Sequence, residues 1–225
     1  MKSETAEEAP GTTLPDGFAR VWGSFFAALY NPLLWRTERR GNAERRSRLL
    51  RGAGGKVVEL GAGTGHNLAH YDEQVELILT EPHEPMARRL ERHLAQSGRE
   101  GTVLRAPAEA LPLPEDYADT VVSTLVLCTV GDLEASLAEV RRVLRPGGQL
   151  LFLEHVAAEE GTRLHRWQRR AHGFWHGFAC GCNTNRETET AIRDSGFRIE
   201  KLITDRLEFD VPLIHPLIWG RAVNP

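Results

Sequence analysis

The chain is short of cysteine and lysine and has no long hydrophobic run, and each shortage excludes a class of protein. Three cysteines in 225 residues do not form a disulfide framework, and Cys180 and Cys182 are too close in sequence for an unstrained bridge. A reducing compartment fits this composition best. The longest apolar stretches, such as residues 120–130, are too short to span a membrane, and the acidic residues 1–10 do not resemble a signal peptide. We therefore expect a cytoplasmic protein with no integral membrane segment.

Lysine is rare because arginine supplies 25 of the 28 basic residues. The formal net charge is -3, so the chain is not expected to bind nucleic acid. Seven of the arginines fall between Arg36 and Arg51, which we interpret as a solvated helix face, with docking on an acidic lipid surface as the alternative. The hydrophobic content of 41% is that of an ordinary globular protein, for which this length indicates one compact domain and an appendage.

From Lys56 onward, alternating strands and helices indicate an α/β fold. The predicted strands span residues 56–60, 75–81, 101–105, 119–126, 149–155, 197–205 and 214–223. The predicted helices span residues 66–71, 84–97, 133–144, 162–177 and 187–195. Short apolar runs between helices form βαβ units and a parallel sheet. The last two strands have no helix between them, which predicts an antiparallel hairpin.

The part of the chain before Lys56 has a different character. Residues 1–13 are polar and predict a disordered tail. Residues 14–55 predict a helical N-terminal lid, in which two helices are separated at Asn31–Pro32. The sheet domain then spans residues 56–225 and carries an insert at about 160–185.

The most informative segment is VVELGAGTG at residues 57–65. Its three glycines alternate between a predicted strand and a predicted helix, which lets the chain turn sharply and lets a ligand approach the backbone. His66 stands where a dinucleotide fingerprint would have its last glycine, so the segment departs from that motif. Glu81 ends the next predicted strand, 20 residues after Gly61, where a carboxylate can bind both hydroxyls of a ribose. Together these residues indicate a nucleoside site rather than a mere tight turn and a surface glutamate.

This combination resembles the class I S-adenosylmethionine-dependent methyltransferases, from about Lys56 to Arg221. Two further segments resemble that class, namely RAPAEALPL at 105–113 and LAEVRRVLRPGGQL at 137–150. A closer resemblance, to the thiol S-methyltransferase branch called methyltransferase-like protein seven, is carried by TLVLCTV at 124–130, LFLEHVA at 151–157, RWQ at 166–168, NRET at 185–188 and PLIWGRA at 216–222. The class implies a doubly wound, Rossmann-like, seven-stranded methyltransferase sheet with a helical N-terminal lid and an antiparallel last strand. Animal members of the branch carry an N-terminal membrane anchor, which this chain lacks, so we expect a soluble relative.

The resemblance implies that S-adenosylmethionine is the cofactor and that site residues lie beyond the carboxyl ends of the strands. The residues implied to contact the cofactor are Tyr30, Glu59, Gly61, Ala62, Gly63, Gly65, Asn67, Glu81, Pro82, Met86, Ala108, Glu109 and Leu125. The residues implied to contact the acceptor are Cys128, His155, Trp167, Trp175 and His176. Pro107 stands where related families carry an acidic residue, which leaves the adenine amino group to the backbone near Ala108 or to Glu109.

Three interpretations of single residues remain open at this point. His155 is the candidate catalytic base, because imidazole titrates near neutral pH, and the alternative is a strand-end residue bonded to the backbone. Tyr30 either covers the cofactor or packs in the lid. The aromatic residues of the insert form either an acceptor pocket or ordinary core. No metal is expected, because the shared helix face of His165, His172 and His176 is not a known zinc pattern.

The function that these residues predict is methylation of a small molecule. The leading hypothesis is transfer to a sulfur, as a thiol or a disulfide sulfur, in a secondary metabolite such as a peptide antibiotic. The alternatives are an N- or C-methyltransferase of a lipid amine or a quinone-like ring, and a protein that binds S-adenosylmethionine without catalysis. The expected partner is a small-molecule acceptor, and the sequence does not predict an oligomeric state.

Overall fold

A computed structural model describes residues 41–178, 181–207 and 211–225 of the chain. The predicted tail, the first lid helix, Tyr30 and Cys180 lie outside the described residues. Among the residues that are described, no helix has the length and apolar character needed to cross a membrane.

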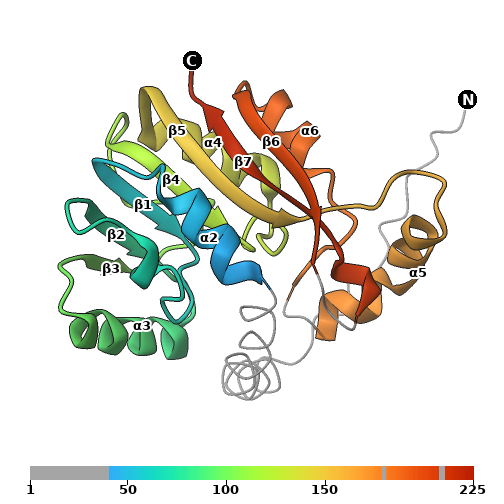
Figure 1. Ribbon diagram of the computed structural model, residues 1–225, viewed down its shortest axis with the longest axis horizontal. Helices are drawn as coiled ribbons and strands as arrows, with labels where there is room; N and C mark the ends of the chain where they lie inside the picture. Colours follow the sequence, from blue (N-terminus) through green and yellow to red (C-terminus); the bar gives the residue numbers. More distant parts are fainter. Residues whose placement is uncertain (1–40, 179–180, 208–210) are drawn as a thin grey trace, which may run out of the picture.

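The described residues form one seven-stranded sheet with flanking helices (Figure 1). The strands are β1 (Lys56–Leu60), β2 (Glu76–Thr80), β3 (Thr102–Leu104), β4 (Ala118–Thr124), β5 (Leu144–His155), β6 (Arg198–Arg206) and β7 (Pro216–Val223). The helices are α2 (Ala43–Leu50), η2 (Leu68–His70), α3 (Glu84–Ser97), α4 (Leu133–Val143), α5 (Arg163–Phe178), α6 (Thr188–Asp194) and η3 (Pro212–Ile214). The order of the strands in the sheet is β3-β2-β1-β4-β5-β7-β6. The first five strands are parallel, whereas β7 is antiparallel to both β5 and β6.

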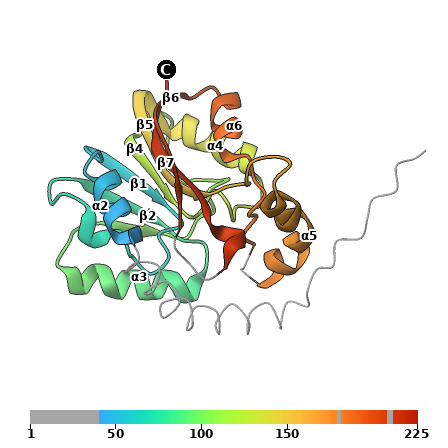
Figure 2. The same cartoon turned by 45° about the vertical axis from the view of Figure 1, so that its right-hand side comes forward.

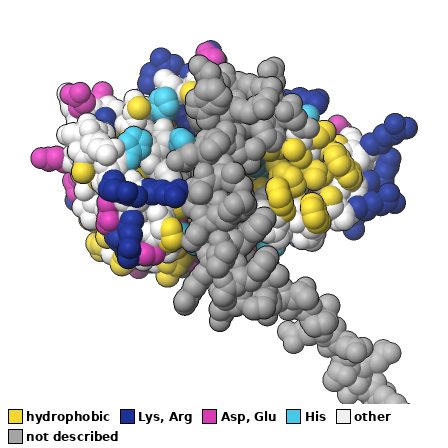
Figure 3. All heavy atoms as spheres, turned by 90° about the horizontal axis from the view of Figure 1, so that it is seen from below, with side chains coloured by type: hydrophobic (Ala, Val, Ile, Leu, Met, Phe, Trp, Pro, Cys, Tyr) yellow, Lys and Arg dark blue, Asp and Glu magenta, His cyan; other side chains and the backbone are white. Residues whose placement is uncertain are grey.

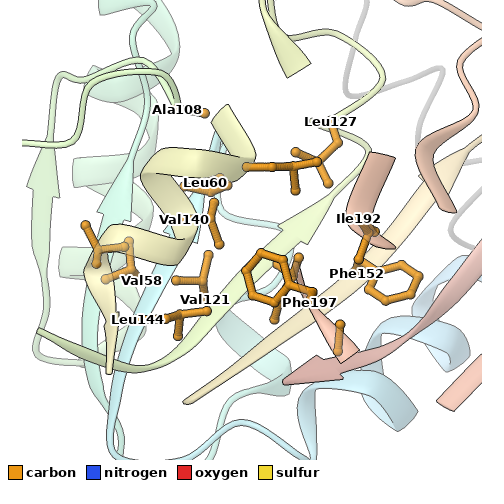
Figure 4. Packing of buried hydrophobic residues seen from close by; sticks show 14 of the residues in the cluster. Val58, Leu60, Ala108, Val121, Leu127, Val140, Leu144, Phe152, Ile192 and Phe197 are labelled. Atoms are coloured by element: carbon orange, nitrogen blue, oxygen red, sulfur yellow. The ribbon is translucent and has the colours of Figure 1, made fainter. Parts of the chain in front are cut away.

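Both faces of the sheet are buried, which is why its parallel strands carry apolar side chains on both faces. Successive side chains of β1 alternate between the faces, so Val58 and Leu60 join one core and Val57 joins the other. The first core packs against α4 and α6 through residues such as Val140 and Ile192 (Figure 4). The second packs against α2, η2 and α3. Figures 1 and 2 show α2 on one side of the sheet and α4 and α6 on the other, so the doubly wound fold is confirmed.

The predicted elements agree with the observed ones apart from two differences. Residues 66–71 form turns and the short η2 instead of an α-helix, because Gly65 has a φ of +90° and its carbonyl accepts the bond from the Leu68 N–H. The strand β5 begins at Leu144, five residues before the predicted start, because residues 144–148 continue the sheet through a bulge in its pairing with β4. The hairpin of β6 and β7 is confirmed.

The helix α5 lies beyond the end of β5, at one end of the molecule (Figure 1). Three large apolar side chains on it are exposed, namely Trp167 at 46%, Phe174 at 78% and Phe178 at 47%. Figure 3 shows hydrophobic side chains gathered at this end of the molecule, bordered by basic side chains. Ordinary core packing of the insert aromatics therefore does not describe these three residues.

Candidate active site

The glycine loop after β1 has a conformation that only glycine adopts without strain. Gly61, Gly63 and Gly65 have φ angles of +49°, +60° and +90°. A Cβ on Gly61 would lie 2.9 Å from the Val126 side chain, and a Cβ on Gly65 would lie 2.8 Å from that of Leu68. At Gly63 the nearest atom is a backbone oxygen 4.0 Å away. Packing therefore requires the outer two glycines, whereas Gly63 leaves an open backbone surface that a ligand can approach.

Glu81 lies directly beside this open surface, at the end of β2. One of its carboxylate oxygens accepts a hydrogen bond from the Gly63 N–H at 3.0 Å, and the other accepts from the His83 N–H at 2.9 Å. The residue is 3% exposed, and burial raises the pKa of the carboxyl group. Pro82 and Met86 follow at the start of α3, with Pro82 exposed and Met86 half-buried. The structure thus brings the predicted loop and the predicted ribose carboxylate together.

A buried network of polar side chains holds the glycine loop in place. Glu59 accepts hydrogen bonds from Asn67 Nδ2 at 2.9 Å and from the Tyr71 hydroxyl at 2.7 Å. Arg46, on α2, donates to Asn67 Oδ1 and to Thr124 Oγ1, both at 2.8 Å. Burial raises the pKa of Glu59 to about 7, although the hydrogen bond from Tyr71, the charge of Arg46 and the hydrogen bond from Asn67 act in the opposite direction. The network joins the loop to α2 and to the end of β4.

The structure bears on two sequence predictions about this network. Asn67 is fully buried, and its amide is bonded to Arg46, Glu59 and Thr124, so it positions the loop, and its contact with the cofactor stays a prediction. The arginine-rich helix is not a uniformly solvated face, because Arg46 is only 4% exposed and Arg45 pairs with Asp205 at 2.7 Å. Composition alone does not distinguish a buried arginine from its exposed neighbours, which is why these contacts were missed.

The turn after β4 is shaped by a buried carboxylate that the sequence analysis did not select. Glu154 accepts hydrogen bonds from Ser123 Oγ at 2.6 Å and from the N–H groups of Val126 and Cys128 at 3.2 Å each. Leu125, the first residue of the turn, has a φ of +61°, which is unfavourable for a side chain with a Cβ. Such backbone conformations are concentrated at functional sites. An acidic residue near the end of an otherwise apolar strand was the available signal for Glu154.

Residues 181–186 lie against the same turn and bring a second cysteine to it. The Asn183 N–H donates to the Cys128 carbonyl at 2.7 Å, and the Arg186 guanidinium donates to the carbonyls of Leu127 and Val130. As a result, the Sγ atoms of Cys128 and Cys182 are 4.0 Å apart, and His155 Nδ1 is 3.9 Å from Cys182 Sγ.

The contact between the two thiols shifts their pKa values in opposite directions. The hydrogen bond between the two sulfurs lowers the pKa of Cys182 and raises that of Cys128, whose thiol is also buried. Sequence analysis predicted Cys128 and His155 on the acceptor side but not Cys182. Nothing in the local sequence pairs two residues that are 54 positions apart.

Comparison with known proteins identifies this arrangement. Residues 58–152 match the family described as Methyltransferase domain. The human protein named thiol S-methyltransferase TMT1A is 35% identical over 178 residues, which cover 77% of this chain and 73% of that protein. The chain belongs to the class I S-adenosylmethionine-dependent methyltransferases. Within that class it falls in the branch of the thiol S-methyltransferases, as the sequence resemblance implied, and S-adenosylmethionine is its cofactor.

Two further similarities extend beyond that branch. A ubiquinone/menaquinone biosynthesis C-methyltransferase, UbiE of Yersinia pestis, is 39% identical over 107 residues, which cover 45% of this methyltransferase and 43% of that protein. The solved structure of a possible histamine N-methyltransferase from Thermotoga maritima has a TM-score of 0.66 at 21% identity, over 91% of this chain and 99% of that one. This structural likeness confirms the fold. Membership of the class also sets aside the alternative of a binding protein without catalysis.

Ala108 and Glu109, which are predicted to border the adenine, lie in a segment that is fixed to the start of α4. Ala108 is buried, and the Glu109 carboxylate accepts hydrogen bonds from the N–H groups of Gly131 at 2.8 Å and Asp132 at 3.2 Å. The Glu109 carboxylate thus already has two partners in the protein. Contact of these residues with adenine stays a prediction.

The insert helix α5 is attached to the sheet through a buried glutamine. Gln168 accepts from the Ala158 N–H at 2.8 Å and donates to the Leu213 carbonyl at 2.9 Å. Trp175 is half-buried, whereas Trp167 and His176 are exposed. Acceptor contact by these three residues stays a prediction, and Trp175 has the most favourable position, because its half-buried indole lies near Cys182 and lowers the pKa of that thiol.

Two surface hollows lie near described elements. The larger, of about 700 Å³, is lined by residues of α4, α6 and the C-terminus, and contains none of the predicted site residues. The smaller, of about 340 Å³, borders the glycine loop at Thr64 and His66 and continues onto α3. We attach no catalytic role to the larger hollow, because no predicted site residue lines it.

Proposed function

We propose that this enzyme transfers the methyl group of S-adenosylmethionine to the sulfur of a small-molecule thiol. The observation that carries the proposal is the Cys128–His155–Cys182 group at the carboxyl ends of β4 and β5, adjacent to the turn that packs on Gly61. The similarity to thiol S-methyltransferases over three quarters of the chain supports the choice of sulfur.

The cofactor would lie across the open backbone at Gly63. The glycine loop would contact its methionine part, and the Glu81 carboxylate would accept hydrogen bonds from the ribose hydroxyls. Pro82 and Met86 would flank the adenine, and Leu125 would lie under the methionine part. A cofactor held in this way would present its methyl group to the acceptor, which would bind near the turn after β4.

Methyl transfer to sulfur needs orientation more than acid–base chemistry. Holding two reactants in line can supply roughly 7–11 kcal/mol of the barrier. A free thiol has a pKa of about 8.5, so a small bias toward the thiolate is sufficient, whereas a hydroxyl acceptor would need a strong base. His155 is 8% exposed and its Nε2 is buried without a hydrogen-bond partner among the described residues, so its imidazole is available to act on the acceptor.

The character of α5 supports a finer proposal for the acceptor. Its half-buried Trp175 and its exposed aromatic side chains would suit a bulky apolar molecule carrying the sulfur. We propose a thiol or disulfide sulfur of a secondary metabolite, such as a peptide antibiotic, methylated in the cytoplasm.

A second candidate is C-methylation of a quinone-like ring. It is favoured by the 39% identity to UbiE, which is confined to 107 residues. A ring carbon would need activation by a base, and His155 would be that base. The related possibility of an N-methyltransferase acting on a lipid amine has no comparable observation in its favour.

Transfer of labelled methyl to a panel of acceptors tests the proposal. The panel should contain alkyl and aromatic thiols, a disulfide, amines and quinols, with binding of S-adenosylhomocysteine measured in parallel by calorimetry. We expect label on thiols. Label on amines or quinols but never on sulfur, in a preparation that binds S-adenosylhomocysteine, would contradict the choice of sulfur.

A further inference from the structure

Two thiols and one imidazole from distant parts of the chain converge in the interior. Cys128 follows β4, His155 ends β5, and Cys182 follows α5. All three residues are buried, and their Sγ and ring nitrogen atoms lie within 4.8 Å of one another. No other cysteine, histidine or carboxylate belongs to this group among the residues that the structure describes.

The spacing of these atoms matches the coordination shell of a tetrahedral metal ion. Zinc bonds of about 2.3 Å to sulfur and about 2.0–2.1 Å to nitrogen place two sulfurs about 3.8 Å apart and a sulfur and a nitrogen about 3.6 Å apart. The observed separations are 4.0 Å between the sulfurs and 3.9 Å between Cys182 Sγ and His155 Nδ1. The third pair, Cys128 and His155, is within 4.8 Å, so a side-chain shift of up to about 1 Å there, and of a few tenths of an ångström for the other two pairs, would complete the shell. A disulfide bond of about 2.05 Å would instead require the sulfurs to approach by about 2 Å.

The protein also fixes the three ligands in place. The N–H of Cys128 is bonded to Glu154, and its carbonyl accepts from Asn183, the residue next to Cys182. His155 is held by the register of β5 with β7, in which it pairs with Leu217. Rigid support of this kind is what a preformed metal site requires.

We propose that Cys128, His155 and Cys182 bind a Zn²⁺-type divalent cation, whose fourth position is open to the acceptor sulfur. Two cysteines, one histidine and an open position form one of the ligand sets of catalytic zinc sites. Soft thiolate ligands select such a cation over magnesium or calcium. The location at the carboxyl ends of β4 and β5 is where acceptors bind in this class of fold.

The catalytic use of the cation rests on the proposed function. The acceptor thiol would release its proton to solvent on binding the cation as a thiolate. A sulfur lone pair would then form the bond to the methyl carbon while the carbon–sulfur bond of the sulfonium breaks, giving a thioether and S-adenosylhomocysteine. His155 would serve as a metal ligand in this arrangement and not as the base.

Cobalt binding tests the site without reference to activity. The reduced full-length protein, handled without oxygen, should bind one Co²⁺ per chain with a thiolate-to-cobalt charge-transfer band that Zn²⁺ removes. We expect C128S and C182S to lose the band, and H155A to weaken binding by at least about 10-fold. H165A, which alters a histidine of α5 outside the group, should bind like the wild-type protein.

X-ray absorption of the zinc-loaded wild-type protein gives a second measurement that does not depend on the folding of variants. Two sulfur neighbours and one nitrogen neighbour are expected. A shell of oxygen and nitrogen alone, absence of the cobalt band in the wild-type protein, or a band that persists in the C128S/C182S double variant would overturn the proposal. If the band forms but thiols are never methylated, the metal site stands and the proposed acceptor fails.

Discussion

Replacement of Glu59 by glutamine should raise the free energy of unfolding above neutral pH and change it little at pH 5. In the folded protein, burial holds the pKa of Glu59 at about 7 instead of 4.5. The unfolded chain therefore releases this proton at a lower pH than the folded protein does. The wild-type protein loses stability as the pH rises from about 4.5 to about 7, because the folded state binds the extra proton in that interval.

The size of the effect follows from the same two values. At about 1.4 kcal/mol per pKa unit, the rise from 4.5 to about 7 corresponds to about 3 kcal/mol. Glutamine has the same shape and keeps one oxygen to accept from Asn67 Nδ2, while its amide NH2 can donate to the Tyr71 hydroxyl, and it has no charge to desolvate. The Glu59→Gln variant should therefore exceed the wild type by about 3 kcal/mol at pH 8 and by less than about 1 kcal/mol at pH 5.

Urea unfolding of both proteins at pH 5 and pH 8 measures this difference. The control is Glu84→Gln, an exposed carboxylate whose pKa is lowered by the hydrogen bonds from Arg105 and Arg88, and it should show no such gain at pH 8. An equal difference at both pH values would refute the reasoning. So would a variant less stable than the wild type at pH 8, since the hydrogen bonds of Glu59 and the charge of Arg46 would then outweigh its burial.

Three further variants, the first with the matched control Gly98→Ala, test the parts of the site separately. Gly63→Ala and Gly98→Ala introduce the same left-handed strain, since both glycines have positive φ and no close neighbours, and each should cost about 1 kcal/mol in urea unfolding. Only Gly63→Ala should also weaken binding of S-adenosylhomocysteine in calorimetry, by at least about 10-fold; equal affinities would place the ligand elsewhere. Glu81→Gln should weaken the same binding by about 10-fold or more, since hydrogen bonds to a charged group contribute about 1.5–3 kcal/mol, and unchanged affinity would exclude a ribose contact. Arg46→Met leaves Asn67 Oδ1 buried without its donor and should cost about 1–3 kcal/mol in urea unfolding; a neutral result would mean that the buried network contributes little.

The sheet could be predicted because its strands are short apolar runs between glycine-rich or polar turns. β1 was predicted at its observed bounds, and β7 was predicted to start two residues before Pro216. The exceptions have local physical causes. The segment after Gly65 has too few residues and too much turn character for an α-helix, and the start of β5 contains Pro146 and Gly147, which usually end strands.

The site could be predicted only where it is local in sequence. The glycine loop and Glu81 were found by their spacing, because the βαβ unit fixes their relation. Cys182 and Arg46 contact the site across long sequence separations, so their roles depend on how the insert and α2 pack. Glu154 lies inside an apolar strand, and its partners are likewise distant in sequence, so a single charged residue there is identified as structural only once those partners are known.

The position of β7 between β5 and β6 has a consequence for biosynthesis. Residues 216–223 are the last strand in the sequence, yet β6 joins the sheet only through them. During translation, β5 therefore stays an unpaired edge, and β6 stays without a partner, until this final strand has left the ribosome. Chains that terminate early would expose the apolar edge of β5, which favours their aggregation or proteolysis. Completion of the sheet thus depends on the strand that is made after all the others.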